Sequence, residues 1–496
     1  MNDTANKENS YSHVLKYTGI FGGVQGLNIL IGLVRNKLVA LILGPAGMGL
    51  ASLYNTVVNF VSQATNLGIS FSAVKHLSEI FDSGDSRRIE DFVRTVRSWS
   101  IVAAMLGLAV CVAAAPLLDS YVFDGEGHTL AITALAPVVA MTAVTGGETA
   151  ILKGARRLRD LARAQIFMVA ASLIISVPIY WLAGQAGIIP VILLITAANT
   201  ALTLRYSLRL FPLRLSGARG SLAAGGDMVR LGMAFIMSGV FGSGAEMVVR
   251  SYLNTCADLD TVGLYNAGYM ITITYAAMVF SAMETDYFPR LSAVNHDTEA
   301  VNMAANRQIE VSLLIISPML VLMITALPLL IPLLYSGKFA PVASMAQAAA
   351  LSMYAKAAAT PVEYITLAKG HSKAYLTLEL VFDCLFAALV IVCFRWWGLT
   401  GTGIALCVTY FINAAMIFTY ARLRYGYRPS RQVWIYMAVQ IPLGLAAYLS
   451  TFIGHTAAYM AAACVLTAAS AAVSTYALYK KTDVWQKITA KLRRRR

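Results

Sequence analysis

The feature that most constrains this chain is a series of long apolar runs separated by short polar breaks. A helix needs about 20 apolar residues to cross a hydrocarbon core of about 30 Å. With 58% hydrophobic and only 13% charged residues over 496 positions, and a mean hydropathy of +0.65, the chain is too apolar for an ordinary soluble protein. Long continuous runs favour helices over the short alternating strands of a β-barrel. We therefore expect an all-α membrane protein.

The apolar runs predict fourteen membrane-spanning helices with mostly short connections. The segment from Met1 to Lys16 is polar and is not followed by a cleavage pattern, so we expect the first helix to remain in the protein. The predicted spans are 17 to 43, 47 to 69, 98 to 118, 129 to 152, 164 to 183, 187 to 204, 228 to 252, 261 to 284, 308 to 334, 342 to 368, 373 to 394, 400 to 421, 432 to 452 and 456 to 479.

Lys and Arg are concentrated in every second loop and in both terminal segments. Cytoplasmic loops of membrane proteins accumulate these residues, so we expect both termini in the cytoplasm and the protein in the bacterial inner membrane. The net charge of +14 follows from this topology, and the basic tail Lys491 to Arg496 is expected to contact anionic lipid rather than nucleic acid. The remaining cations are Arg35, Lys37, Arg250, Lys338, Lys356 and Arg395.

An internal repeat is visible at an offset of 214 residues, where Gly49-Leu50 recurs as Gly263-Leu264 and Leu77-Ser78 as Leu291-Ser292. The first six predicted helices then pair in register with the next six. We expect one lobe at 1–210, a second at 211–425, and an appendage at 426–496 that contains two further helices and the tail. An even number of helices per lobe makes the repeat parallel, so two lobes can enclose a central cavity and rock to give alternating access.

Polar residues inside the spans indicate the substrate site, because a charge near the bilayer centre costs about 2.5 kcal/mol or more. Position 36 corresponds to Arg250 by the repeat, so Arg35 and Lys37 flank its counterpart. Such cations suit a diphosphate or an acidic sugar; the alternative is contact with interfacial lipid phosphates. Helical spacing aligns Gln25, Asn28, Gly32 and Arg35 on one face, and Asn55, Asn59, Ser62 and Asn66 on another. The predicted substrate-binding residues are Arg35, Lys37, Arg250, Asn28, Asn59 and Asn66.

Acidic residues form a second set, which can carry a coupling proton or sodium ion or can hold a cation in an ion pair. Glu246 precedes Arg250 by one helical turn. Glu148 and Glu363 occupy nearly equivalent places in the two halves, and Lys356 shares a face with Glu363, which favours an ion pair there. The candidates for coupling or ion pairing are Glu246, Glu148, Glu363, Glu379 and Asp383.

Motifs of nucleotide-binding, hydrolytic and metal-dependent enzymes are missing from the sequence. The six His residues and six Cys residues do not form a ligand pattern, so we expect no metal site and no cofactor. Asp258-Leu-Asp260 weakly resembles the acidic motif of membrane glycosyltransferases, but the outer loops are too short for a catalytic domain. We therefore expect a transporter rather than an enzyme.

The stretch from Lys37 to Leu50, KLVALILGPAGMGL, resembles the end of the first helix and the following turn in Wzx flippases of O-antigen and enterobacterial common antigen synthesis. These flippases belong to the MOP superfamily of multidrug, oligosaccharidyl-lipid and polysaccharide exporters. The resemblance continues, in order and at suitable spacing, at Arg250, at Val262-Gly263-Leu264-Tyr265, at Lys338-Phe339 and at Ala368-Lys369.

The resemblance implies a MATE-like fold and the movement of an undecaprenyl-pyrophosphate-linked oligosaccharide from the cytoplasmic to the periplasmic leaflet. It implies contacts of Lys37 and Arg250 with the pyrophosphate or with acidic sugars, whereas Arg35 departs from the family pattern. The partners implied are the lipid-linked glycan, membrane lipids, a polysaccharide polymerase and a chain-length regulator. Two alternatives keep the fold: a cation-coupled MATE-like exporter, and a murein lipid II flippase, in which helices 13 and 14 have counterparts.

Overall fold

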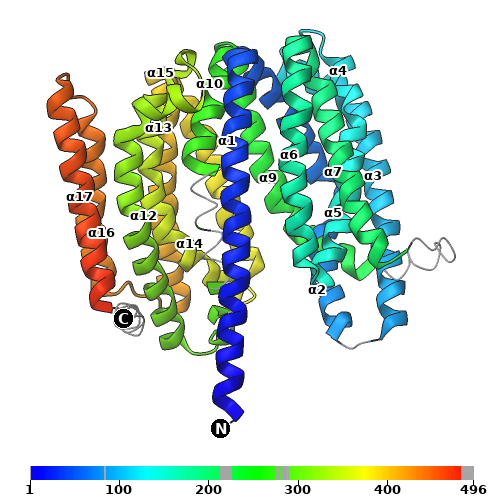
Figure 1. Cartoon of the computed structure of the whole chain (residues 1–496), viewed down its shortest axis with the longest axis horizontal. Helices are drawn as coiled ribbons and strands as arrows, with labels where there is room; N and C mark the ends of the chain where they lie inside the picture. The colour runs from blue at the N-terminus through cyan, green and yellow to red at the C-terminus, as the bar shows by residue number, and fades with distance from the viewer. Residues whose placement is uncertain are drawn as a thin grey trace, which may run out of the picture. The chain divides into compact units, whose positions relative to one another are not determined.

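The backbone of the computed structural model is described for residues 2–82, 85–212, 226–274, 280, 287–288 and 290–481 (Figure 1). The described side chains begin at Leu30 in the first helix and at Ile236 in the helix after the 213–225 gap. Within these ranges the regular elements are all helical, which confirms the prediction of an all-α protein. The chain divides into two compact units, Met1–Gly263 with Leu334–Ser336, and Leu264–Leu333 with Gly337–Arg496.

The first unit is built around a central helix that packs against several others. This helix, α5, contacts α2, α3 and α7, while α1 contacts α6 and α9. An apolar core that includes Ala73, Leu77, Ile89, Val93 and Val96 lies between α2 and α3. The elements are α1 Asn2–Thr65, α2 Ile69–Asp82, α3 Ser86–Val122, α4 Thr129–Ala134, α5 Ala136–Gly154, α6 Leu158–Ala183, η1 Gly184–Gly187, α7 Ile188–Leu210, α9 Gly226–Cys256 and the start of α10, Leu259–Tyr269.

In the second unit, one long kinked helix packs against two shorter ones. The long helix, α15, contacts both α13 and α14, and a separate pair, α16 and α17, lies side by side at the edge of this unit (Figure 1). After α10, the elements are η2 Met270–Thr274, α12 Thr298–Leu334, η3 Gly337–Phe339, α13 Val342–Ala350, α14 Ser352–Ala368, α15 Ser372–Tyr425, α16 Arg431–Ser450 and α17 Thr456–Lys481.

All predicted spans coincide with described helices, except that the last part of 261–284 lies outside the described residues. By length and apolar composition, eight helical stretches of the described chain can cross a membrane. Three of these stretches contain two predicted spans each, because the helix is bent rather than interrupted by a loop, so the eight stretches include eleven predicted spans. The other three, 228–252, 261–284 and 342–368, lie outside these stretches. The first helix extends beyond its predicted span, since α1 begins at Asn2 and no Gly or Pro precedes Gly19 to break it.

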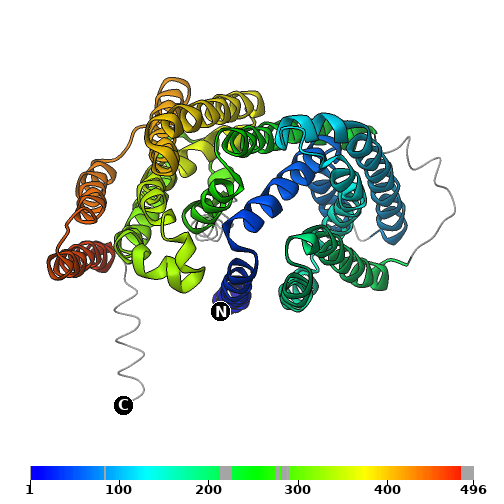
Figure 2. The same cartoon turned by 90° about the horizontal axis from the view of Figure 1, so that it is seen from above.

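The repeat of 214 residues recurs in the breaks between helices. The kink of α1 at Gly44 corresponds to the gap between α9 and α10, and the break between α4 and α5 corresponds to that between α13 and α14. Gly184 ends α6 with φ 56°, and its counterpart Gly398 bends α15 with the same φ. Only glycine adopts this conformation without strain, so the same bend is encoded twice. Figure 2 shows the two arms of α1 running in different directions from its kink.

A reciprocal contact joins the second arm of α1 to the start of α10. A Cβ atom at Gly49 would overlap with the carbonyl oxygen of Leu259, and a Cβ at Gly263 would overlap with that of Pro45. Gly49 and Gly263 are repeat partners, as are Pro45 and Leu259, so the contact is locally two-fold symmetric. Glycine at both positions allows the two backbones to approach closely, as small residues do in membrane helix packing. The division into lobes at 1–210 and 211–425 itself stays a prediction.

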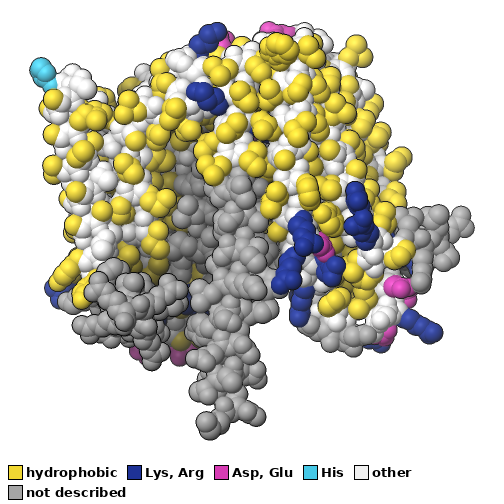
Figure 3. Space-filling model, viewed as in Figure 1, with side chains coloured by type: hydrophobic (Ala, Val, Ile, Leu, Met, Phe, Trp, Pro, Cys, Tyr) yellow, Lys and Arg dark blue, Asp and Glu magenta, His cyan; other side chains and the backbone are white. Residues whose placement is uncertain are grey.

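Large apolar side chains cover the outward faces of the helices, as expected for a protein solvated by lipid (Figure 3). Leu182 is 80% exposed, Trp181 77% and Ile174 71%, all on α6. In a water-soluble protein such a surface would be an association site. Here it places the helices in the hydrocarbon region.

Candidate functional site

Arg250, a predicted substrate-binding residue, is buried near the C-terminal end of an apolar helix, α9. Its side chain is only 6% exposed, and its guanidinium donates to Oε2 of Glu246 at 2.8 Å, one turn earlier on the same helix. The Glu246 side chain is 37% exposed, so its carboxylate is accessible, whereas the guanidinium of Arg250 is buried. The next turn anchors α9 on α3, because Ser251 and Asn254 donate to the carbonyl oxygens of Tyr121 and Val122.

Arg35 and Lys37, the two cations of α1 that are predicted to bind substrate, are half-buried and lie before the kink. Nε of Arg35 donates to Oγ of Ser176 at 3.4 Å, which directs its guanidinium to α6. Lys37 is on the same arm, and the side chain of Asn28 lies outside the described residues. The structure thus places Arg35 beside α6, and Arg250 beside its helix partner Glu246.

The asparagines predicted on the second arm of α1 have different surroundings. Asn59 is exposed, so its side chain lies on an accessible face of the helix. Asn66 instead ends the helix: its Oδ1 accepts the backbone N–H of Gly68 at 2.7 Å, and its Nδ2 donates to Gln63 at 3.2 Å. This is a capping arrangement, in which a short polar side chain satisfies backbone groups at a helix end. A substrate contact of Asn66 stays a prediction.

Glu148 lies in an interhelical ion pair within the first unit. The carboxylate accepts from Nε of Arg97 on α3 at 2.8 Å and from a terminal nitrogen at 3.3 Å, and the side chain is only 4% exposed. Arg97 also donates to the carbonyl oxygen of Phe211 and to Oγ of Ser207, which ties α3, α5 and the end of α7 together. The structure thus places Glu148 in an ion pair with Arg97, and a coupling role of Glu148 stays a prediction.

The other acidic candidates gather on α14 and α15 in the second unit. Tyr375 is hydrogen-bonded to Glu379 and lies near Glu363, and one turn beyond Glu379 the side chain of Asp383 is buried. The ammonium of Lys356, on α14, lies 5.8 Å from the centre of the Tyr410 ring. These groups form a polar patch inside apolar helices, as a proton or cation site requires. Their role in coupling stays a prediction.

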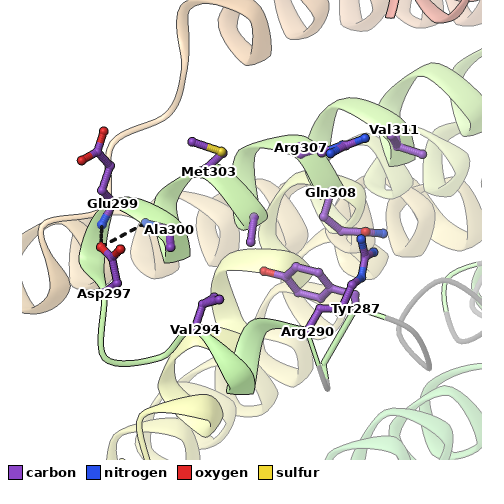
Figure 4. Close-up of a pocket in the computed structure, with 11 residues that line it drawn as sticks. Tyr287, Arg290, Val294, Asp297, Glu299, Ala300, Met303, Arg307, Gln308 and Val311 are labelled. Atoms are coloured by element: carbon purple, nitrogen blue, oxygen red, sulfur yellow. Dashed lines mark hydrogen bonds between the residues drawn. The ribbon is translucent and has the colours of Figure 1, made fainter. Parts of the chain in front are cut away.

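A cavity of about 770 Å³ opens beside the N-terminal half of α12 in the second unit (Figure 4). Arg290, Arg307 and Gln308 lie together at one end, and Asp297 and Glu299 lie at the other. The remaining lining is mostly apolar, with Tyr287 along one side. Its hydroxyl donates to the carbonyl oxygen of Pro361 at 2.7 Å, and burial raises its pKa, so it stays neutral.

The charge pattern of the sequence places Arg97, Arg290 and Arg307 in cytoplasmic loops and predicts no specific role for them. Their position at the edges of predicted spans is a weak indication of a specific role, because a charged side chain there can face the protein as well as water. Their partners and surroundings come from segments far away in sequence, so the pattern by itself could not identify them. Among the described residues, no group of His, Cys, Asp and Glu is arranged to hold a metal ion.

The fold resembles that of several solved transporters. An inward-facing multidrug resistance MATE-family transporter of the MOP superfamily aligns with a TM-score of 0.66 at 16% identity, over 80% of this chain and 94% of that one. The lipid II flippase MurJ, in an inward closed conformation, aligns with a TM-score of 0.69 at 12% identity, over 93% and 99%. A MOP-superfamily transporter from Pyrococcus furiosus, described as having a binding pocket of reverse polarity, gives 0.52 at 15% identity, over 82% and 94%.

These likenesses confirm the predicted MATE-like all-α membrane fold. No curated protein matches the chain by sequence. Residues 38–344, more than half of the chain, match the family described as polysaccharide biosynthesis protein. The chain is therefore a multi-pass membrane protein that belongs to the polysaccharide biosynthesis protein family.

Proposed function

We propose that this protein is a flippase that moves an undecaprenyl-pyrophosphate-linked oligosaccharide, the unit of O-antigen or enterobacterial common antigen, across the bacterial inner membrane. The observation that carries the proposal is the buried Arg250, held by Glu246 inside an apolar helix of a chain in the polysaccharide biosynthesis family. The direction is from the cytoplasmic to the periplasmic leaflet, by rocking of two repeated lobes.

Arg250 suits a phosphate head group for physical reasons. Burying a guanidinium costs several kcal/mol unless a carboxylate and hydrogen bonds compensate for the lost water, and Glu246 supplies the compensating charge in the substrate-free state. A diphosphate that enters beside the exposed Glu246 carboxylate can take over this role, because arginine binds phosphate oxygens in a bidentate way. By the repeat, Arg35 and Lys37 flank the counterpart of Arg250, so we propose that they add positive charge to the same substrate path.

The structural likeness to MurJ supports a lipid-linked substrate. The alignment with MurJ covers 93% of this chain, whereas the alignment with the inward-facing MATE transporter covers 80%. The larger coverage is what we expect if MurJ also has helices equivalent to α16 and α17. The acidic patch of Glu363, Glu379 and Asp383 favours the second candidate, a cation-coupled exporter, but it fits the flippase equally well as the site that takes up a proton and resets the cycle.

The test compares Arg250→Glu with Arg250→Lys and with Arg163→Glu as a matched control. Arg163 lies on α6 of the same unit and its side chain is 66% exposed. We expect Arg250→Glu to reduce translocation by at least about 100-fold, because two carboxylates then stand where a cation is proposed to meet the diphosphate, and like charges side by side cost several kcal/mol. Arg250→Lys keeps the positive charge but cannot make the bidentate contact with phosphate, so we expect a translocation rate between those of the unaltered protein and Arg250→Glu.

The measurement is the amount of lipid-linked oligosaccharide that accumulates on the inner leaflet of cells that carry each variant as the only copy. Membrane-inserted protein is quantified in parallel, and Arg163→Glu should transport normally. Normal export by correctly inserted Arg250→Glu would contradict the proposed role of Arg250.

A further inference from the structure

The cavity beside α12 departs from the internal repeat. In the first unit, the equivalent space between α2 and α3 is filled by an apolar core in which Ile89 is 8% and Val93 2% exposed. Their repeat partners are Met303, which is 67% exposed, and Arg307, which is also exposed. The space is therefore filled in the first unit, whereas in the second unit it is an open cavity.

Substitutions within the repeat also make the open copy polar. Arg307 stands where the first half has Val93, Arg290 where it has His76, and Tyr287 where it has Ala73. An apolar core residue is thus replaced by an arginine that lines a cavity of about 770 Å³. Arginine binds phosphate oxygens in a bidentate way, so a second arginine beside Arg290 in this cavity suits an anionic ligand.

The charges of the cavity are separated along α12. Glu299 and Arg307 are eight residues apart, which corresponds to about 12 Å along a helix axis, too far for an ion pair. Asp297 is engaged at the start of the helix, where its Oδ1 accepts the backbone N–H groups of Glu299 and Ala300 at 2.8 and 3.2 Å. Asp297 and Glu299 thus lie at the opposite end of the cavity from Arg290 and Arg307, as Figure 4 shows.

We infer that this cavity is a second anion site, which binds the phosphate group of a membrane-anchored lipid through Arg290, Arg307 and Gln308. The inference rests on the proposed function, because it makes the cavity the place where the diphosphate of the lipid-linked substrate is first held. On the predicted topology, the cavity lies at the cytoplasmic ends of the second unit's helices, the side from which the substrate enters. A phosphate of an ordinary phospholipid has the same chemistry, so the test must distinguish the two sources.

The experiment measures lipid binding by the purified full-length protein in detergent, with native mass spectrometry or fluorescence titration. The probes are undecaprenyl diphosphate, phosphatidylglycerol and undecaprenol, which lacks a phosphate. The variants are Arg290→Gln, Arg307→Gln and the double variant. Arg431→Gln is the matched control, because Arg431 is an exposed arginine of the same unit that does not line the cavity.

We expect each single variant to weaken undecaprenyl diphosphate binding by about tenfold, and the double variant by more, since each loses a charge-assisted hydrogen bond. Arg431→Gln should change the affinity by less than about twofold, and undecaprenol should bind all variants alike. Loss of diphosphate binding that exceeds the loss of phosphatidylglycerol binding assigns the site to the substrate; the opposite order assigns it to bulk phospholipid.

Unchanged affinity of the double variant for both phosphate-bearing lipids would overturn the inference. That result is distinguishable from failure of the proposed function, because translocation by the unaltered protein and its dependence on Arg250 are measured separately. Circular dichroism and size-exclusion profiles of the double variant show that it is folded. Both arginines are at least partly exposed to solvent, so their replacement by Gln should not disturb a packed core.

Discussion

Removing Arg97 should destabilise the first unit more than removing the whole ion pair that it forms. Arg97→Met leaves Glu148, which is 4% exposed, as a buried charge without its two hydrogen bonds from the guanidinium. Breaking a buried pair in this way costs about 3–5 kcal/mol. The carbonyl oxygen of Phe211 also loses a donor at 2.9 Å, which adds about 1 kcal/mol.

The double variant Arg97→Met, Glu148→Leu removes both charges and fills most of the volume. Replacing an entire buried ion pair by apolar residues is often neutral or stabilising, so we expect a net cost of no more than about 1 kcal/mol, from the lost contact with Phe211. The assay is reversible unfolding in mixed micelles of mild detergent and dodecyl sulfate, followed by tryptophan fluorescence. Arg163→Met, at an exposed arginine of the same unit, is the control.

Transport by the same variants separates a structural from a coupling role of Glu148. If the pair is structural, the double variant regains both stability and translocation, whereas a coupling carboxylate cannot be replaced by Leu. A cost of less than about 1 kcal/mol for Arg97→Met alone would refute the reasoning, because it would mean that water reaches the pair and that its burial has little energetic weight.

Two further outcomes test the packing. Gly49→Ala should cost about 1–3 kcal/mol by forcing α1 away from the carbonyl oxygen of Leu259, while Gly32→Ala, which meets no atom within 4 Å, should be neutral or stabilising by up to about 1 kcal/mol; unfolding in mixed micelles measures both. Asn306→Leu should cost about 2–3 kcal/mol and lower the thermal unfolding midpoint, because it leaves the hydroxyl of Tyr427 and the backbone N–H of Ser430 without their acceptor; an unchanged midpoint would contradict this.

The sequence predicted the helices well because their signals are local. Apolar runs long enough to span a bilayer recur along the chain, and Gly44, Gly184 and Gly398 mark the bends. The offset of 214 residues was detected from a few identities, yet the breaks between helices follow it through both halves. Local residue types and their order were therefore enough to predict the all-α membrane fold.

The candidate site was predictable only in part. Arg250 and Glu246 are four residues apart on one helix, so helical spacing alone indicated their pairing. Arg97 and Glu148 are 51 residues apart, and no local pattern relates them. Asn66 shares the spacing of a polar stripe, and that spacing did not indicate that its side chain accepts the backbone N–H of Gly68 at the helix end.

By itself the sequence determined that the chain spans a membrane many times, that its helices are duplicated, and which helices contain costly charges. Hydropathy, backbone freedom at glycine and helical spacing are properties of short segments. The tertiary structure alone decided that Glu148 is paired with Arg97 and that Arg307 lines a cavity where Val93 fills a core. The physical reason is that burial and charge compensation depend on which distant segments pack together, and two copies of one repeat can pack differently with only a few side chains changed.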